Sequence, residues 1–124
     1  MPRTVVDLIS ARPIDLAIVE GIKTMAGGEG PWVRGCKAVE PGVIVAGTNP
    51  VNVDAVSMAV MGFDPAADRG TPPFETSDST LRLAESVGIG TRDLKLIEVV
   101  GTPIRQAMFD FAELRRQRRH TVHG

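Results

Sequence analysis

One stretch of the chain combines the clearest strand with the clearest helix start, and it reads Val43-Ile44-Val45-Ala46-Gly47-Thr48-Asn49-Pro50-Val51-Asn52-Val53-Asp54-Ala55-Val56. The four apolar residues at 43–46 predict a strand. Asn49 or its neighbour Thr48 is suited to cap the helix that follows, and the proline after them fits a first helical position. That helix should run to about Met61, because a glycine comes next. It is apolar almost all round, so we expect it to be largely buried.

Strand and helix signals alternate along the rest of the chain. Helices are expected over 4–11, over 77–87 and on an apolar face that begins at 104, and further strands over 15–20, 37–40 and 94–100. Pro41-Gly42 suits the centre of a type II turn, so 37–40 and 43–46 should form a hairpin-like pair. The alternation predicts an α/β fold, with helices packed on a small, mainly parallel sheet. The edges of so small a sheet stay exposed unless a partner covers them, as in an incomplete or half domain.

Length and composition bound the class of protein. The chain has 124 residues, and we divide it into an α/β domain over 1–104 and a C-terminal amphipathic helix with a basic tail over 105–124. A net charge of -1, one Trp and no Tyr argue against nucleic-acid binding. No apolar run approaches the roughly 20 residues that span a bilayer, so no membrane contact is expected. No leader-like segment opens the sequence, which predicts a cytoplasmic protein.

A glycine-rich loop follows the strand expected at 15–20. It reads Met25-Ala26-Gly27-Gly28-Glu29-Gly30-Pro31 and closes at Gly35. Such a backbone adopts positive φ readily and can lie close to another molecule. Its successive N–H groups suit an anion, although Glu29 is itself an anion there. The alternative is a tight connection that packs against the sheet.

The candidate ligand site combines this loop with the start of the helix at 50–61. Its residues are Gly27, Gly28, Gly30, Asn49 and Asp54. Both segments leave a predicted strand at its C-terminal end, and in a parallel sheet these ends share one edge. The positive end of the helix would point there. Asp54 would hold the loop, bind a cation or act as a base, and the sequence assigns neither a catalytic residue nor a set of metal ligands.

Other reactive side chains give weaker signals. Cys36 is the one cysteine, so the chain holds neither an internal disulfide nor a four-thiolate cluster. His120 and His123 fall in the predicted tail and are poor partners for a catalytic cysteine. The arginines at 115, 116, 118 and 119 read as a solvated helix end.

Three blocks of sequence together resemble the family called domain of unknown function 362. They are Leu16–Ile22 with the glycine loop, the strand–helix stretch quoted above with its continuation to Pro65, and Ala84–Gly101. The resemblance covers about residues 14–101 and corresponds to the C-terminal half of the usual domain. Glu20 and Asn49 stand where the family usually has aspartate, which weakens a metal or acid–base role at Asn49.

Three functions remain open at this point, and neither enzymatic activity nor a cofactor is assigned. The first is a small-ligand or metal site at the glycine-rich loop. The second is a non-catalytic half-domain that completes its fold with itself or with another chain. The third, implied by the family resemblance alone, is an accessory to an iron–sulfur redox protein without a cluster of its own. We expect a homo-oligomer, or a complex with a chain that supplies the missing half of the family domain.

Overall fold

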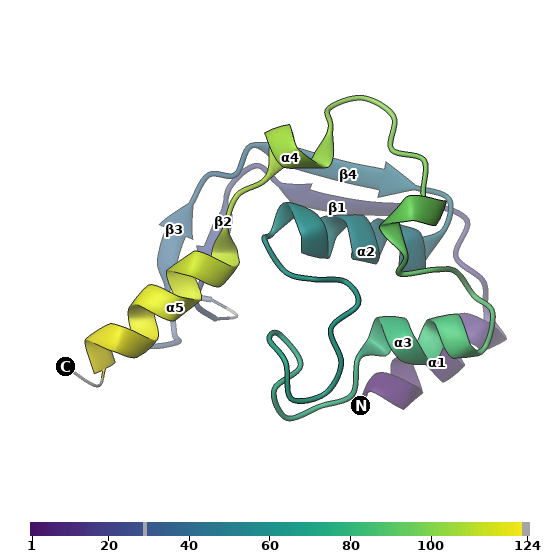
Figure 1. The fold of residues 1–124 in the computed structure, drawn as a ribbon, viewed down its shortest axis with the longest axis horizontal. Coiled ribbons are helices and arrows are strands. Elements are labelled where there is room, and N and C mark those ends of the chain that lie inside the picture. Colours follow the sequence, from purple (N-terminus) through teal and green to yellow (C-terminus); the bar gives the residue numbers. More distant parts are fainter. Residues whose placement is uncertain (29, 123–124) are drawn as a thin grey trace.

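The structure is a computed structural model that describes residues 1–28 and 30–122, with side chains up to residue 117. Its elements, shown in Figure 1, are α1 (Pro2–Ala11), β1 (Ala17–Gly21), β2 (Thr24–Ala26), β3 (Lys37–Val39), β4 (Val43–Gly47), α2 (Pro50–Val60), α3 (Thr80–Ser86), the 3₁₀ helix η1 (Leu94–Leu96), α4 (Ile104–Ala107) and α5 (Phe111–Val122). No helix in these ranges is long and apolar enough to cross a membrane.

The strands form two antiparallel ribbons. β1 pairs with β4, with Ala17 opposite Gly47 and Gly21 opposite Val43. β2 pairs with β3 in the same sense. The chain thus runs out along β1 and β2, turns through the glycine loop and returns along β3 and β4. At the junction of the two ribbons, the Gly42 N–H donates to the Ile22 carbonyl at 3.3 Å.

The prediction of a mainly parallel sheet is therefore wrong, and so is the pairing of 37–40 with 43–46. Antiparallel pairing needs only a turn between strands, whereas parallel pairing needs a crossover of a dozen or more residues. The glycine loop supplies the turn for the long hairpin. A crossover through α2 and α3 does follow β4, but it leads to a segment that joins neither ribbon.

That segment is the strand expected at 94–100. Its first half is the 3₁₀ helix η1, and Ile97 then adopts extended backbone, with φ −110° and ψ 121°. Residues 98–103 form neither helix nor strand. A strand needs a neighbour at hydrogen-bonding distance, and a cleft separates this segment from β4. The backbone at Ile97 is therefore extended, as the sequence predicts, but this segment has no hydrogen-bonded strand of the described residues beside it.

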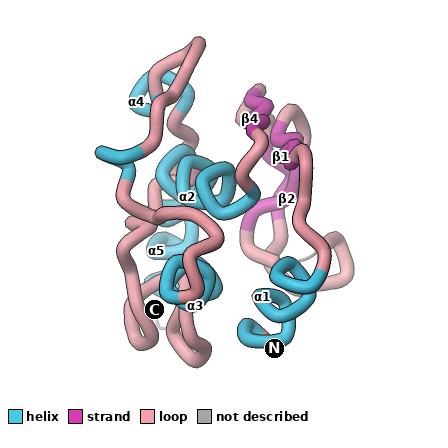
Figure 2. Tube along the Cα trace, turned by 90° about the vertical axis from the view of Figure 1, so that its right-hand side faces the viewer, coloured by secondary structure: helices cyan, strands magenta, loops and turns pink. Residues whose placement is uncertain are grey.

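Helix α2 is the centre of the fold. It packs on the inner face of the β1–β4 ribbon, and most of its side chains are buried, as its composition predicts. One flank is closed by α1 and α3 (Figure 2). The core there consists of Val6, Val51, Ala55, Leu81 and Ala84.

The C-terminal segment ties back to the end of α2 through its backbone. The helix expected from residue 104 is split into α4 and α5 by a break at residues 108–110. In the break, the Phe109 N–H donates to the Val60 carbonyl at 2.8 Å. The Phe111 N–H donates to the Met61 carbonyl at 2.9 Å. These bonds satisfy carbonyls that the end of a helix leaves without a partner.

Candidate functional site

The structure does not gather the five candidate residues into one place. Because β1 and β4 are antiparallel, their C-terminal ends lie at opposite ends of the ribbon. The glycine loop therefore lies beyond the β2–β3 ribbon, near α5, while Asn49 lies at the far end, where α2 begins (Figure 1). The shared crevice assumed from a parallel sheet does not form. Binding at either place separately stays a prediction.

The glycine loop packs against itself. A Cβ on Gly28 would lie 2.7 Å from Val33 Cγ1 and 2.9 Å from Cys36 Sγ. A Cβ on Gly30 would collide with the Trp32 ring, and the Gly30 carbonyl accepts from the Val33 N–H at 3.0 Å. Close packing against Val33 and Cys36 thus accounts for glycine at position 28, whereas the exposed Trp32 ring can move away from position 30. This supports a tight connection, and Glu29 lies outside the described residues.

Asn49 is fully used in holding the start of α2. Its Oδ1 accepts from the Val51 and Asn52 N–H groups at 3.0 and 3.1 Å. Its carbonyl accepts from the Val53 N–H at 3.0 Å, and its Nδ2 donates to the Ile89 carbonyl at 2.7 Å. Since proline has no N–H, every N–H of the first turn already has an acceptor. The helix start is therefore capped from within rather than open to an anion.

Asp54 lies one turn further along α2, and its side chain is exposed by surface area. Its surroundings nevertheless desolvate the carboxylate enough to raise the pKa of Asp54 above its ordinary value. Within the part of the chain that the structure describes, the Asp54 carboxylate has no hydrogen bond or ion pair. Across those same residues, no three His, Cys, Asp or Glu side chains are placed to hold a metal ion.

Sequence reasoning missed a polar junction that joins the segments flanking α3. The Glu85 carboxylate accepts from the Arg92 N–H at 2.8 Å and from the Thr91 hydroxyl at 3.0 Å. These bonds, with the Arg92 charge beside them, lower the pKa of Glu85. The Arg92 side chain, 17% exposed, also pairs with Asp68 at 2.9 Å. Isolated acids and arginines in the sequence carry no signal for such a junction.

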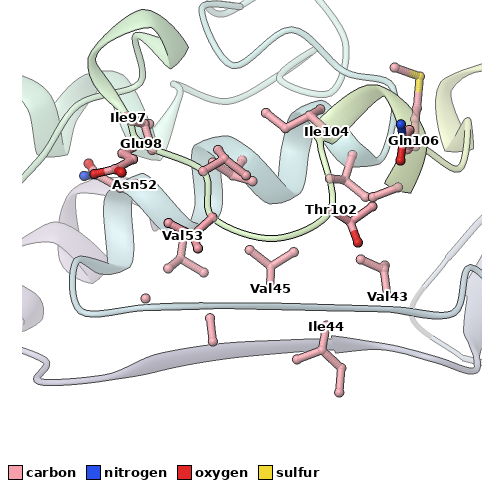
Figure 3. A pocket seen from close by; sticks show the side chains of 18 of the residues that line it. Val43, Ile44, Val45, Asn52, Val53, Ile97, Glu98, Thr102, Ile104 and Gln106 are labelled. Carbon is pink, nitrogen blue, oxygen red and sulfur yellow. The ribbon is translucent and has the colours of Figure 1, made fainter.

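Sequence reasoning also missed a cleft of about 670 Å³ on the open flank of α2. β4 forms one wall along its whole length, α2 forms the floor, and residues 96–108 form the opposite wall. Figure 3 shows Val43 and Val45 turned toward the cleft and Ile44 turned away from it, with Thr102 and Ile104 on the facing wall. The strand-like sequence 97–100 was the available signal, because the structure leaves it without a strand partner.

Both walls of the cleft carry backbone without partners. β4 has β1 on one side, and no further strand of the described residues lies on its other side. Every second peptide group of β4 therefore points away from β1. On the facing wall, the peptide groups of 98–102 make no hydrogen bond to any described residue. The cleft is thus a lane between two unpaired lengths of chain, with exposed backbone on both walls and valines on its floor.

Comparison with known proteins gives a match to a family model. No curated protein and no solved structure matches the chain. Residues 1–59 match the model of the family described as Domain of unknown function (DUF362). The matched range holds the first block of the resemblance and the strand–helix stretch, whereas the block at 84–101 lies beyond it. The resemblance is therefore confirmed, and over residues 1–59 the chain is similar to DUF362, a family whose description assigns no function.

Proposed function

We propose that this chain is a non-catalytic half-domain that completes its sheet by accepting one extended strand from another polypeptide along the free edge of β4. The observation that carries the proposal is the cleft, which follows that edge from end to end. Addition of a strand to an exposed sheet edge is an established mode of peptide recognition.

The size of the cleft suits a single strand. β4 has five residues. A strand of that length occupies a lane about 17 Å long and ~4.8 Å wide in a layer ~10 Å thick, which is on the order of 800 Å³. The cleft volume of about 670 Å³ is comparable with this.

The chemistry of the walls favours a strand over a small molecule. A bound strand would pair with the outward peptide groups of β4 and would bring partners to the unbonded peptide groups of 98–102. Its inward side chains would meet Val53 and Val56 on the floor, so small apolar residues should alternate along it. An apolar small molecule would fill the same volume but leave the peptide groups on both walls without partners.

The second wall also favours another chain over a second copy of this one. Residues 96–108 stand beside the β4 edge, so the lane admits an isolated strand. A second folded copy would bring its own residues 96–108 to the same place if the two β4 edges paired. We therefore favour a partner that contributes an extended segment.

Hydrogen exchange on the intact chain tests this proposal. Alone, the outward amides of β4 and the amides of 98–102 should exchange rapidly. A peptide of about six residues that alternates Val and Thr should slow exchange in both segments. The same peptide with a central proline should not, because proline removes a donor. Equal protection by both peptides, or slow exchange without any peptide, would contradict strand addition.

A pair of variants locates the binding. Val99→Asp puts a charge on the cleft wall and should abolish protection by the Val/Thr peptide. Val5→Asp puts the same charge on exposed α1, which packs against α3 rather than along the cleft, and should leave protection unchanged. Equal loss in both variants would overturn the assignment to the cleft.

A further inference from the structure

The outer face of the β1–β4 ribbon, turned away from α2, is apolar and uncovered. Ile18 is 62% exposed and Ile44 is 57% exposed. Leu16, just before β1, and Ile22, just after it, are also exposed. Along β4 the exposure alternates residue by residue, so the outward positions are unambiguous.

This sequence is unusual for a solvent-facing side of an antiparallel ribbon. Such a face normally alternates to polar residues, because only the inner face packs on the core. Here the outward positions of the paired strands are Ile18 opposite Ala46 and Glu20 opposite Ile44, so one of the four is charged. The pattern is that of a strand pair covered on both faces.

Resting on the strand addition proposed above, we infer that the same partner also lays an amphipathic helix along this outer face. The partner would then be a strand–helix unit of another chain. Its helix would carry an apolar stripe against Ile18 and Ile44, with a basic residue beside the Glu20 carboxylate.

Helix α2 shows the fit of a helix to this ribbon. Its 11 residues span about 16.5 Å, at 1.5 Å per residue. The five residues of β1 span about the same length at ~3.3 Å per residue. Two strands are about 10 Å wide, which is close to one helix diameter. One helix of similar length therefore covers the outer face as α2 covers the inner face.

The area of the face argues against a second copy packed there by itself. A ribbon of this length and width presents about 170 Å² in projection. A stable interface buries about 800 Å² on each partner. A contact confined to this face would therefore be too small for a stable interface, but the face adjoins the edge at which a strand would be added. A helix joined to that strand would dock at a high effective concentration.

Two synthetic peptides test this inference on the intact chain. One is the Val/Thr strand peptide, and the other is the same strand joined by a short flexible linker to an amphipathic helix with a Leu/Ala stripe flanked by lysines. The helix-bearing peptide should bind at least about 10-fold more tightly. A version with the stripe residues scrambled should bind no better than the strand alone.

The double variant Ile18→Lys with Ile44→Lys separates this inference from the proposed function. Because both side chains are exposed, its thermal unfolding midpoint should match that of the unaltered chain. It should bind the strand peptide equally well and lose the added affinity of the helix. Equal binding of both peptides to the unaltered chain would overturn the helix inference alone. Failure of the strand peptide to bind would overturn the proposed function.

Discussion

The two flanks of α2 differ in how far the chain itself completes them. On the flank toward α1 and α3, Val51 and Ala55 are buried against Leu81 and Ala84, and the polar groups at the helix start are paired. On the other flank, side chains of the same helix form the floor of a cleft. Helix α2 is thus packed in a closed core on one side and borders an open cleft on the other.

The difference shows what decides whether a segment becomes regular structure. α3 is flanked by the Ser79 cap and the Glu85–Arg92 junction, and it has a packed face against α1. Ile97, Val99 and Val100 have apolar side chains, and Ile97 has extended backbone, but this segment has no described strand to pair with. Both segments have a sequence that favours regular structure. Only α3 has both packed neighbours and hydrogen-bond partners from elsewhere in the described chain.

The largest expected effect comes from truncating a leucine on each flank. Leu81 is 3% exposed in the closed core, so Leu81→Ala should cost about 2–5 kcal/mol of unfolding free energy. Leu96 is 72% exposed on the cleft wall, so Leu96→Ala should change it by less than about 0.5 kcal/mol. Urea unfolding of the two variants measures both values. Similar losses would mean that the cleft side is already a packed core.

The next largest loss of stability is expected from variants of Asn49, at the start of α2 on the closed flank. Asn49→Ala removes the helix cap and the bond to the Ile89 carbonyl, and should cost about 2–3 kcal/mol in all. Asn49→Asp keeps a capping oxygen but loses the donor to Ile89, and should cost about 1 kcal/mol. Thr48→Ala, beside it and without a hydrogen bond to any described residue, is the control. Equal effects of the two Asn49 variants would remove the cap from the account, and an Asn49→Asp variant as stable as the unaltered chain would remove the bond to Ile89.

Local features of the fold were predictable from residues close together in the sequence. The cap at Asn49, the burial of α2 and the strands at 17–21 and 43–47 all follow from neighbouring residues. The direction of strand pairing was not predictable in the same way. The direction of pairing depended on which neighbour β4 would have. One candidate was β1, which precedes β4 across a long loop, and the other was a strand that follows α2 and α3. Nothing within a few residues of either strand distinguishes these outcomes.

The candidate site failed as a cluster for the same reason. The glycine loop and Asn49 were joined only by the assumption of parallel strands. The cleft, in contrast, depends on an absent pairing between segments about fifty residues apart. Sequence patterns report what a segment favours, and they carry little information about which neighbours it finally meets.

A smaller change in the free energy of unfolding is expected when the pH falls, because Glu85 on the closed flank becomes protonated. Its pKa is lowered in the folded chain, first by the hydrogen bond from the Arg92 N–H. Its contribution to stability is thus complete above the ordinary value of about 4.3 and is lost as pH falls through the lowered value. The stability difference between the unaltered chain and Glu85→Gln should shrink over that window, as measured by urea unfolding at a series of pH values. Glu98→Gln, on the cleft wall, removes the same charge without those bonds and is the control. A difference that grows in acid would contradict the role of the junction.

The smallest effect has the opposite sign and concerns Asp54, on α2 itself. Partial burial raises its pKa in the folded chain, so folding favours the protonated form. The stability that Asp54 contributes is therefore complete below the ordinary value of about 3.9 and falls as pH rises through the raised value. Asp54→Asn should unfold at a higher urea concentration than the unaltered chain at neutral pH, with the difference vanishing in acid.

If Asp54 binds a cation, Mg²⁺ or Ca²⁺ should stabilise the unaltered chain at neutral pH and leave the variant unchanged, because carboxylates are their preferred ligands. If Asp54→Asn is less stable than the unaltered chain at neutral pH without added metal, the carboxylate has a stabilising partner. The polar groups of α2 would then be paired beyond the closed flank as well.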